Sequence, residues 1–159
     1  MNFSASGMQF KKLVESCKLV AYPDPGSKDG KPWTIGYGHT GPEVAEGLSW
    51  TQEKADQVLI DDSAIRARRV ARLVTVSIHQ GQFDALVDFE FNTGALASST
   101  LLKKVNAKDY AGARAEFARW IYNDGKAMLG LRRRALGRQL LWDGVPGAEA
   151  YRRAWSEVK

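Results

Sequence analysis

The sequence predicts an α+β fold that is mainly helical, with a small lobe containing a β-sheet and a larger helical lobe joined by a long helix. Three observations lead to this prediction. An apolar stripe with helical spacing lies near the amino terminus, a stretch rich in glycine and proline follows it, and nearly everything after residue 50 has helical periodicity. We expect one domain over residues 1–159, with the small lobe at about 15–50 and the helical lobe at about 73–159 plus the N-terminal helix.

The first predicted element is an amphipathic helix over residues 7–17, which Ser6 is expected to cap. Its apolar side chains fall at i, i+3, i+4 and i+7 on one stripe: Phe10, Leu13, Val14 and Cys17. Glu15 lies nearly opposite this stripe, where the ordinary role is a solvated surface charge. It also lies in the last turns, where the helix dipole and unpaired carbonyls raise the proton affinity of a carboxylate, as a general acid requires.

Residues 22–47 are predicted to form a small, irregular β region. Glycine and proline recur through it, Asp29-Gly30 is a dipeptide typical of hairpin turns, and residues 33–35 are a short β-prone run. Asp24 lies between Pro23 and Pro25, where the chain cannot be helical. The ordinary role of an aspartate in such a segment is to form a turn.

The rest of the chain is predicted to be helical. Cap residues from Ser49 onward precede a long helix over about 51–73, which is long enough to bridge two lobes. His79 is expected at a helix start, and Gly94 is expected to end the helix whose apolar stripe includes Phe83 and Phe91. Four shorter helices are expected at 99–105, 109–120, about 131–142 and 147–155.

Composition limits the possible functions. A single cysteine and two histidines give no internal disulfide and too few ligands for a Cys/His metal site, so we expect no metal and no cofactor. No apolar run is long enough to span a bilayer, and residues 1–10 lack the features of a signal peptide or signal-anchor segment, so we expect no stable membrane insertion. The net charge of +5 favours an anionic partner such as nucleic acid, a membrane surface or an acidic wall polymer.

Two segments of the small lobe carry a specific resemblance. Glu15-Ser-Cys-Lys-Leu-Val-Ala-Tyr-Pro-Asp24, followed by Trp33-Thr-Ile-Gly-Tyr-Gly-His-Thr40, resembles the catalytic segment of the tailed-phage lysozymes, or endolysins, of glycoside hydrolase family 24. Later stretches resemble the helical lobe of the same enzymes: Phe91–Gly94, Ser99–Leu102, Phe117–Trp120 and Gly130–Arg134. The resemblance therefore covers nearly the whole chain and implies a lysozyme-like fold.

The resemblance also implies a reaction and a set of roles. The chain would hydrolyse the β-1,4 bond between N-acetylmuramic acid and N-acetylglucosamine in bacterial peptidoglycan, with Glu15 as general acid, Asp24 as second carboxylate and Thr34 positioning the attacking water. These roles fit glycoside hydrolysis, which needs one protonated and one ionised carboxyl group. Two departures from the family pattern stand out: residues 27–31 lengthen the loop before Thr34, and Ser16 replaces a glycine common in relatives.

Further residues are candidates for contact with the wall. Four of them are expected to bind substrate: Tyr37, His39, Trp120 and Arg132. The alternative for His39 is a structural hydrogen bond or ion pair near the cleft, and the run Arg132–Arg134 is ordinarily a solvated helix face. Aromatic side chains at helical spacing, in turn, more often belong to a core.

The expected partner is peptidoglycan, with no nucleic acid, and the expected state is a monomer. The resemblance implies synthesis in the host cytoplasm, with access to the wall after a holin permeabilises the inner membrane. Two other classes compete with this interpretation. A lytic transglycosylase would act on the same polymer without consuming water, but Asp24 and Thr34 argue against it. A basic binding module would leave the cluster of catalytic-type residues unexplained.

Overall fold

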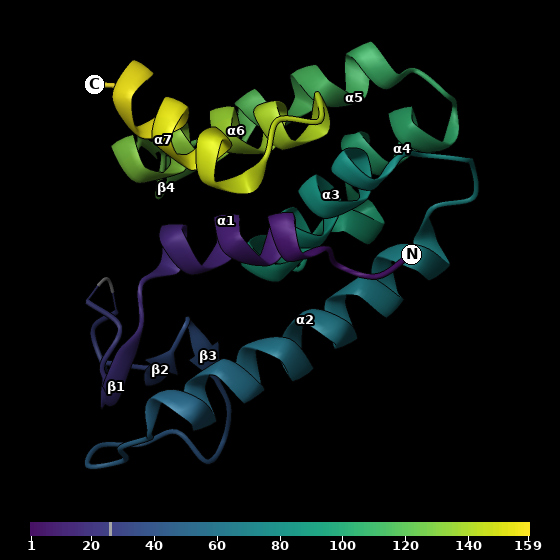
Figure 1. Cartoon of the computed structure of the whole chain (residues 1–159). Helices are drawn as coiled ribbons and strands as arrows, with labels where there is room; N and C mark the ends of the chain where they lie inside the picture. Colours follow the sequence, from purple (N-terminus) through teal and green to yellow (C-terminus); the bar gives the residue numbers. More distant parts are fainter. Residues whose placement is uncertain (26) are drawn as a thin grey trace. The chain divides into compact units, whose positions relative to one another are not determined.

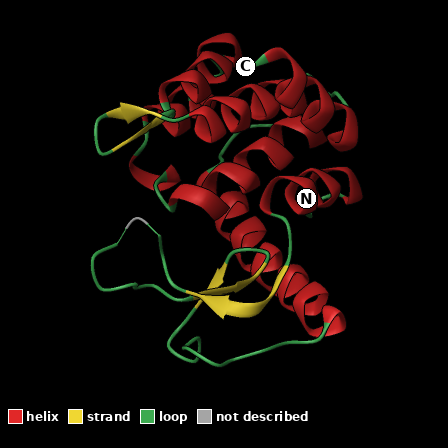
Figure 2. Ribbon diagram, turned by 90° about the vertical axis from the view of Figure 1, so that its left-hand side faces the viewer, coloured by secondary structure: helices red, strands yellow, loops and turns green. Residues whose placement is uncertain are grey.

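The computed structural model describes residues 1–25 and 27–159 (Figure 1). It divides into two compact units, one made of Met1–Val14 and Ile65–Lys159 and the other of Glu15–Ala64. Helices make up most of the chain, and the strands form two small antiparallel sheets (Figure 2). The predicted α+β class is confirmed.

The unit Glu15–Ala64 contains a three-stranded antiparallel sheet in the order β1-β2-β3. Its strands are β1 (Lys18–Tyr22), β2 (Thr34–Gly36) and β3 (His39–Thr40). In this register Lys18 lies opposite Gly36 and Tyr22 opposite Thr34, with an irregularity between them. One side of the sheet covers a small apolar core of Ala21, Ile35 and Val44, with Trp33, Leu48 and Trp50 packed against it.

The first helix, α1 (Ala5–Glu15), differs from its prediction at both ends. It begins after Ser4, whose Oγ accepts a hydrogen bond from the Gly7 N–H at 3.1 Å. The predicted cap at Ser6 is wrong, because Ser6 lies inside the helix and accepts from the Gly147 N–H instead. Ser16 has a φ of 45°, so Cys17 falls beyond the helix and is only partly buried. The predicted stripe therefore holds at Phe10, which is fully buried, but Leu13 is 42% exposed.

The long helix and its successors follow the prediction closely. Helix α2 (Gln52–Leu73) begins after Thr51, whose hydroxyl accepts from the Lys54 N–H. Helix α3 (Gln80–Thr93) is capped by His79 and ends at Gly94, whose φ is 61°. The remaining helical elements are η1 (Leu96–Ser98), α4 (Thr100–Asn106), α5 (Tyr110–Glu116), η2 (Phe117–Arg119), α6 (Leu129–Trp142) and α7 (Gly147–Glu157).

A second, two-stranded sheet was not predicted. It consists of β4 (Tyr122–Asn123) and β5 (Lys126–Ala127). The turn between them is Asp124-Gly125, with φ values of 49° and 76°. Both residues thus adopt the left-handed region that a tight hairpin turn requires, and this dipeptide is the sequence signal for the hairpin.

The core of the helical unit contains a buried ionic cluster. The Asp88 carboxylate on α3 accepts a hydrogen bond from Arg138 Nε on α6 at 2.7 Å and lies 3.8 Å from Lys11 Nζ on α1. Arg138 Nη2 also donates to Asn92 Oδ1 at 2.5 Å. The Asp88, Lys11 and Arg138 side chains are at most 2% exposed, so the Asp88 carboxylate meets both cations away from solvent.

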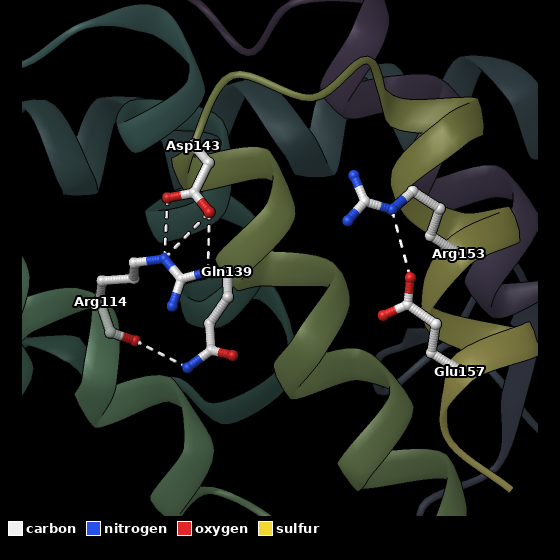
Figure 3. Close-up of polar contacts among 5 residues, drawn as sticks. All are labelled: Arg114, Gln139, Asp143, Arg153 and Glu157. Carbon is white, nitrogen blue, oxygen red and sulfur yellow. Dashed lines mark hydrogen bonds and ion pairs between the residues drawn. The ribbon is translucent and has the colours of Figure 1, made fainter.

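Replacing Asp88 with alanine is expected to lower the free energy of unfolding by about 3–5 kcal/mol, because it leaves the buried guanidinium of Arg138 without the carboxylate that it binds at 2.7 Å. The matched control is Asp143→Ala, which removes the half-exposed pair that Asp143 forms with Arg114 (Figure 3). An exposed pair contributes about 1 kcal/mol or less. Urea denaturation of both variants measures the difference, and equal losses would contradict a stabilising role for the buried cluster.

No helix in the part of the chain that the structure describes is long and apolar enough to cross a membrane.

Candidate active site

The three predicted catalytic residues all belong to the unit Glu15–Ala64, and β1 connects two of them. Glu15 is the last residue of α1 and precedes the strand, while Asp24 follows the strand after one intervening proline. Thr34 is the first residue of β2 and lies directly opposite Tyr22. The sheet therefore brings Thr34 beside the segment that carries Asp24, although the two residues are ten positions apart in sequence.

The register also fixes which way Thr34 faces. Residues paired across antiparallel strands present their side chains on the same face, so Tyr22, Thr34 and Thr40 share one face of the sheet. Ile35 points to the opposite face and is fully buried in the small core. Thr34 is only partly buried, so its hydroxyl lies on the face away from that core and is able to donate to and accept from a water molecule.

The long loop after Asp24 is closed by its own hydrogen bonds. The Asp24 N–H donates to the Gly30 carbonyl at 2.9 Å, and the Ser27 N–H donates to the Asp24 carbonyl at 3.2 Å. Asp29 Oδ1 accepts from both the Ser27 hydroxyl and the Lys31 N–H, which lowers the pKa of Asp29. The hydrogen bond between Asp24 and Gly30 thus returns the chain to Asp24 at the end of the extra residues.

Glu15 lies against the turn between β2 and β3. A Cβ atom added to Gly38 would lie 3.2 Å from Glu15 Oε2 and 3.6 Å from its Cδ, and Gly38 has a φ of 85°. A glycine satisfies both conditions at once, because it has no side chain to meet the carboxyl group and adopts a positive φ without strain. The Thr-Ile-Gly-Tyr-Gly-His motif therefore brings backbone next to Glu15 where a side chain would crowd it.

His39 forms the ion pairs that its alternative role predicted. Its Nδ1 lies 2.6 Å from Asp62 Oδ2 on α2, and its Nε2 lies 2.7 Å from Glu43 Oε1. Burial lowers the pKa of the ring, but the hydrogen bonds and charges of Asp62 and Glu43 outweigh it and raise the pKa above its ordinary value. The protonated ring donates from both nitrogens, so His39 joins β3 to α2 and to the following loop.

These pairs predict a pH dependence of stability. Because the folded-state pKa of His39 exceeds the unfolded value of about 6.5, its contribution is fully present below about pH 6.5 and is lost as the pH rises through the folded-state pKa. The difference in unfolding free energy between wild type and His39→Gln should therefore shrink from mildly acidic to alkaline pH. Urea denaturation across this range measures it; a difference that stays constant would contradict a charged His39.

The other predicted contacts are divided between the two units: Tyr37 lies in the unit Glu15–Ala64, and Trp120 and Arg132 lie in the helical unit. Tyr37 is in the turn before Gly38, and its hydroxyl donates to Asp56. Trp120 belongs to the helical unit, where its ring meets Phe89 edge-on at 4.8 Å. Arg132 is an exposed residue of α6. Their contact with substrate stays a prediction, and no group of His, Cys, Asp or Glu within residues 1–25 and 27–159 is arranged to hold a metal ion.

The fold is that of a lysozyme-like protein, and comparisons with known proteins agree. The Phage lysozyme family profile matches residues 12–137, so the chain belongs to the phage lysozyme family. The endolysin of Bacillus phage B103 is 40% identical over 147 residues, covering 91% of this chain. The SAR-endolysin of Escherichia phage Mu is 39% identical over 121 residues, covering 75% of this chain and 70% of its own length.

A solved structure supports the same assignment. The muramidase domain of SpmX from Asticaccaulis excentricus superposes with a TM-score of 0.78 at 31% identity, covering 89% of this chain and 97% of that domain. The chain spans only 55% of the length of the Bacillus phage endolysin. The resemblance read from the two segments of the small lobe is thus confirmed at the level of family and fold.

Proposed function

We propose that this protein is an endolysin: a muramidase that hydrolyses the β-1,4 bond between N-acetylmuramic acid and N-acetylglucosamine in bacterial peptidoglycan and so lyses the host cell. The observation that carries the proposal is the placement of Glu15 and Asp24 before and after β1, with Thr34 paired to the last residue of that strand. Membership of the phage lysozyme family supports it.

In the proposed reaction Glu15 protonates the glycosidic oxygen as the bond to the leaving sugar breaks. Asp24 is ionised, stabilises the oxocarbenium-like centre and accepts a proton from the attacking water, while the Thr34 hydroxyl orients that water. The new bond to oxygen then forms on the face opposite the leaving group, so the anomeric configuration inverts. Family resemblance supports this division of roles, and the sheet register supports the pairing of Asp24 with Thr34.

The proposal is tested by incubating the purified protein with purified peptidoglycan. We expect the turbidity of a wall suspension to fall while new reducing ends accumulate in proportion. Loss of turbidity without new reducing ends would contradict a muramidase, because an amidase or a peptidase also dissolves the wall. A lytic transglycosylase would likewise release fragments without a free reducing end.

The proposed partner is the wall itself. The protein is synthesised in the host cytoplasm and reaches the wall as a monomer after a holin opens the inner membrane. Several relatives are named SAR-endolysins, so the route is tested by expressing this chain with and without a holin. Lysis only with the holin is expected. If cells without the holin lyse as early as cells with it, the proposed dependence on a holin is wrong.

The charge of the protein predicts a salt effect. With a net charge of +5, the protein should be attracted to the anionic wall, and exposed cations such as Arg132 are proposed to take part. Added salt screens this attraction. The rate on whole walls should therefore fall with ionic strength more than the rate on a short neutral oligosaccharide. If both rates depend equally on salt, electrostatic attraction to the wall does not contribute to activity.

A further inference from the structure

The turn Gly36–Gly38, which contacts Glu15, is fixed to α2 by a compact polar cluster. The Tyr37 hydroxyl donates to Asp56 Oδ1 at 3.0 Å. Gln52 Nε2 donates to the Tyr37 hydroxyl at 3.1 Å and to Asp56 Oδ1 at 3.0 Å. Gln52 and Asp56 are one turn apart at the start of α2, so three hydrogen bonds form a closed triangle among these side chains.

This cluster and the His39 ion pairs bracket Gly38. Tyr37 precedes Gly38 and is bound to Asp56, while His39 follows Gly38 and is bound to Asp62. Both carboxylates belong to α2. The residues on both sides of Gly38, against which Glu15 Oε2 lies, are therefore bound to the same helix.

We propose that the Tyr37–Gln52–Asp56 cluster positions the carboxyl group of Glu15. The cluster holds the glycine turn in place, and the turn in this position holds the carboxyl group. The inference rests on the proposed function of Glu15 as general acid. A general acid must lie within hydrogen-bond distance of the glycosidic oxygen that it protonates. A misplacement of the acid by about 1 Å lowers the rate on the order of a hundredfold. In this role Tyr37 acts through Gly38 and Glu15, and direct contact with the sugar is the alternative that the tests below distinguish.

The first test is Tyr37→Phe, assayed on a soluble, uncrosslinked peptidoglycan oligomer. We expect kcat to fall about tenfold, within the range that such misplacement covers, with KM changed less than about twofold. The matched control is Tyr110→Phe, which also loses one tyrosine hydrogen bond, here to the Ser77 carbonyl at 2.9 Å in the helical unit. That variant should keep its kcat although its loss of stability is similar.

The second test asks whether the hydrogen-bond geometry carries the effect. Asp56→Asn keeps an oxygen that accepts from Tyr37, so it should retain most of the kcat. Asp56→Ala removes the acceptor and should resemble Tyr37→Phe. The double variant Tyr37→Phe/Asp56→Ala should lose no more than either single variant, because both remove the same contact.

Three results would overturn the inference. A rise in KM with unchanged kcat in Tyr37→Phe would make Tyr37 a substrate contact, and an unchanged kcat and KM would leave the cluster without a role. Equal loss of kcat in Tyr110→Phe would reduce the effect to general destabilisation. The wild type is assayed first: if it does not cleave glycan, the proposed function fails, whereas an active wild type with an unaffected Tyr37→Phe variant refutes the positioning role alone.

Discussion

Replacing Glu15 with glutamine is expected to reduce the lysis of purified walls by about a thousandfold while leaving the fold intact. The amide has nearly the shape of the carboxyl group and still fits against Gly38, but it has no acidic proton to give to the leaving sugar. Turbidity loss and release of reducing ends measure the activity, and urea denaturation confirms that the protein is folded.

The matched control for this variant is Glu46→Gln, which changes an exposed glutamate of the same unit. It should retain full activity, since Glu46 lies in the loop before α2 and outside the proposed site. Retention of more than a few per cent of activity by Glu15→Gln would remove Glu15 from the role of general acid.

Asp24→Asn is expected to lower kcat by about a hundredfold, because the amide does not accept a proton from the attacking water and gives no charge to stabilise the oxocarbenium-like centre. Its control is Asp61→Asn, an exposed residue of α2 that accepts a hydrogen bond from Gln57 and should keep wild-type activity. Equal activities of the two variants would exclude a role for Asp24 in the reaction.

The stereochemical outcome tests the pairing of Asp24 with Thr34. A water held by both side chains attacks opposite the leaving group, so the first-formed product from the β-linked polymer should be the α anomer. NMR of the product before mutarotation reports this directly. A predominantly β product would indicate a covalent intermediate on Asp24 and would leave Thr34 without its proposed task.

Much of the helical architecture is predictable from local patterns. The long helix α2, the cap at His79 and the left-handed Gly94 follow from periodicity and capping chemistry, which depend on neighbouring residues alone. Strand β1 is not predictable in this way. Leu19 and Val20 are both exposed, so the strand lacks the alternation of buried and exposed residues that identifies a strand.

The site, too, is only partly predictable from local sequence patterns. Sequence motifs identify Glu15, Asp24 and Thr34, but the alignment of Thr34 with Tyr22 depends on how the intervening loop closes. The partners that α2 supplies to the glycine turn, Asp56 and Asp62, lie about twenty residues further along the chain. On a helix face they are indistinguishable from solvated charges until the fold brings them to the turn.

The claim that this protein hydrolyses the glycan as a muramidase is tested most directly by finding which bond is broken and where the added oxygen comes from. Peptidoglycan is digested with the purified protein in heavy-oxygen water, and the products are analysed by mass spectrometry. We expect muropeptides that end in reducing N-acetylmuramic acid and carry one heavy oxygen atom at the anomeric carbon, since water attacks there. Products that end in anhydro-muramic acid without the label, or in N-acetylglucosamine at the reducing end, would contradict it.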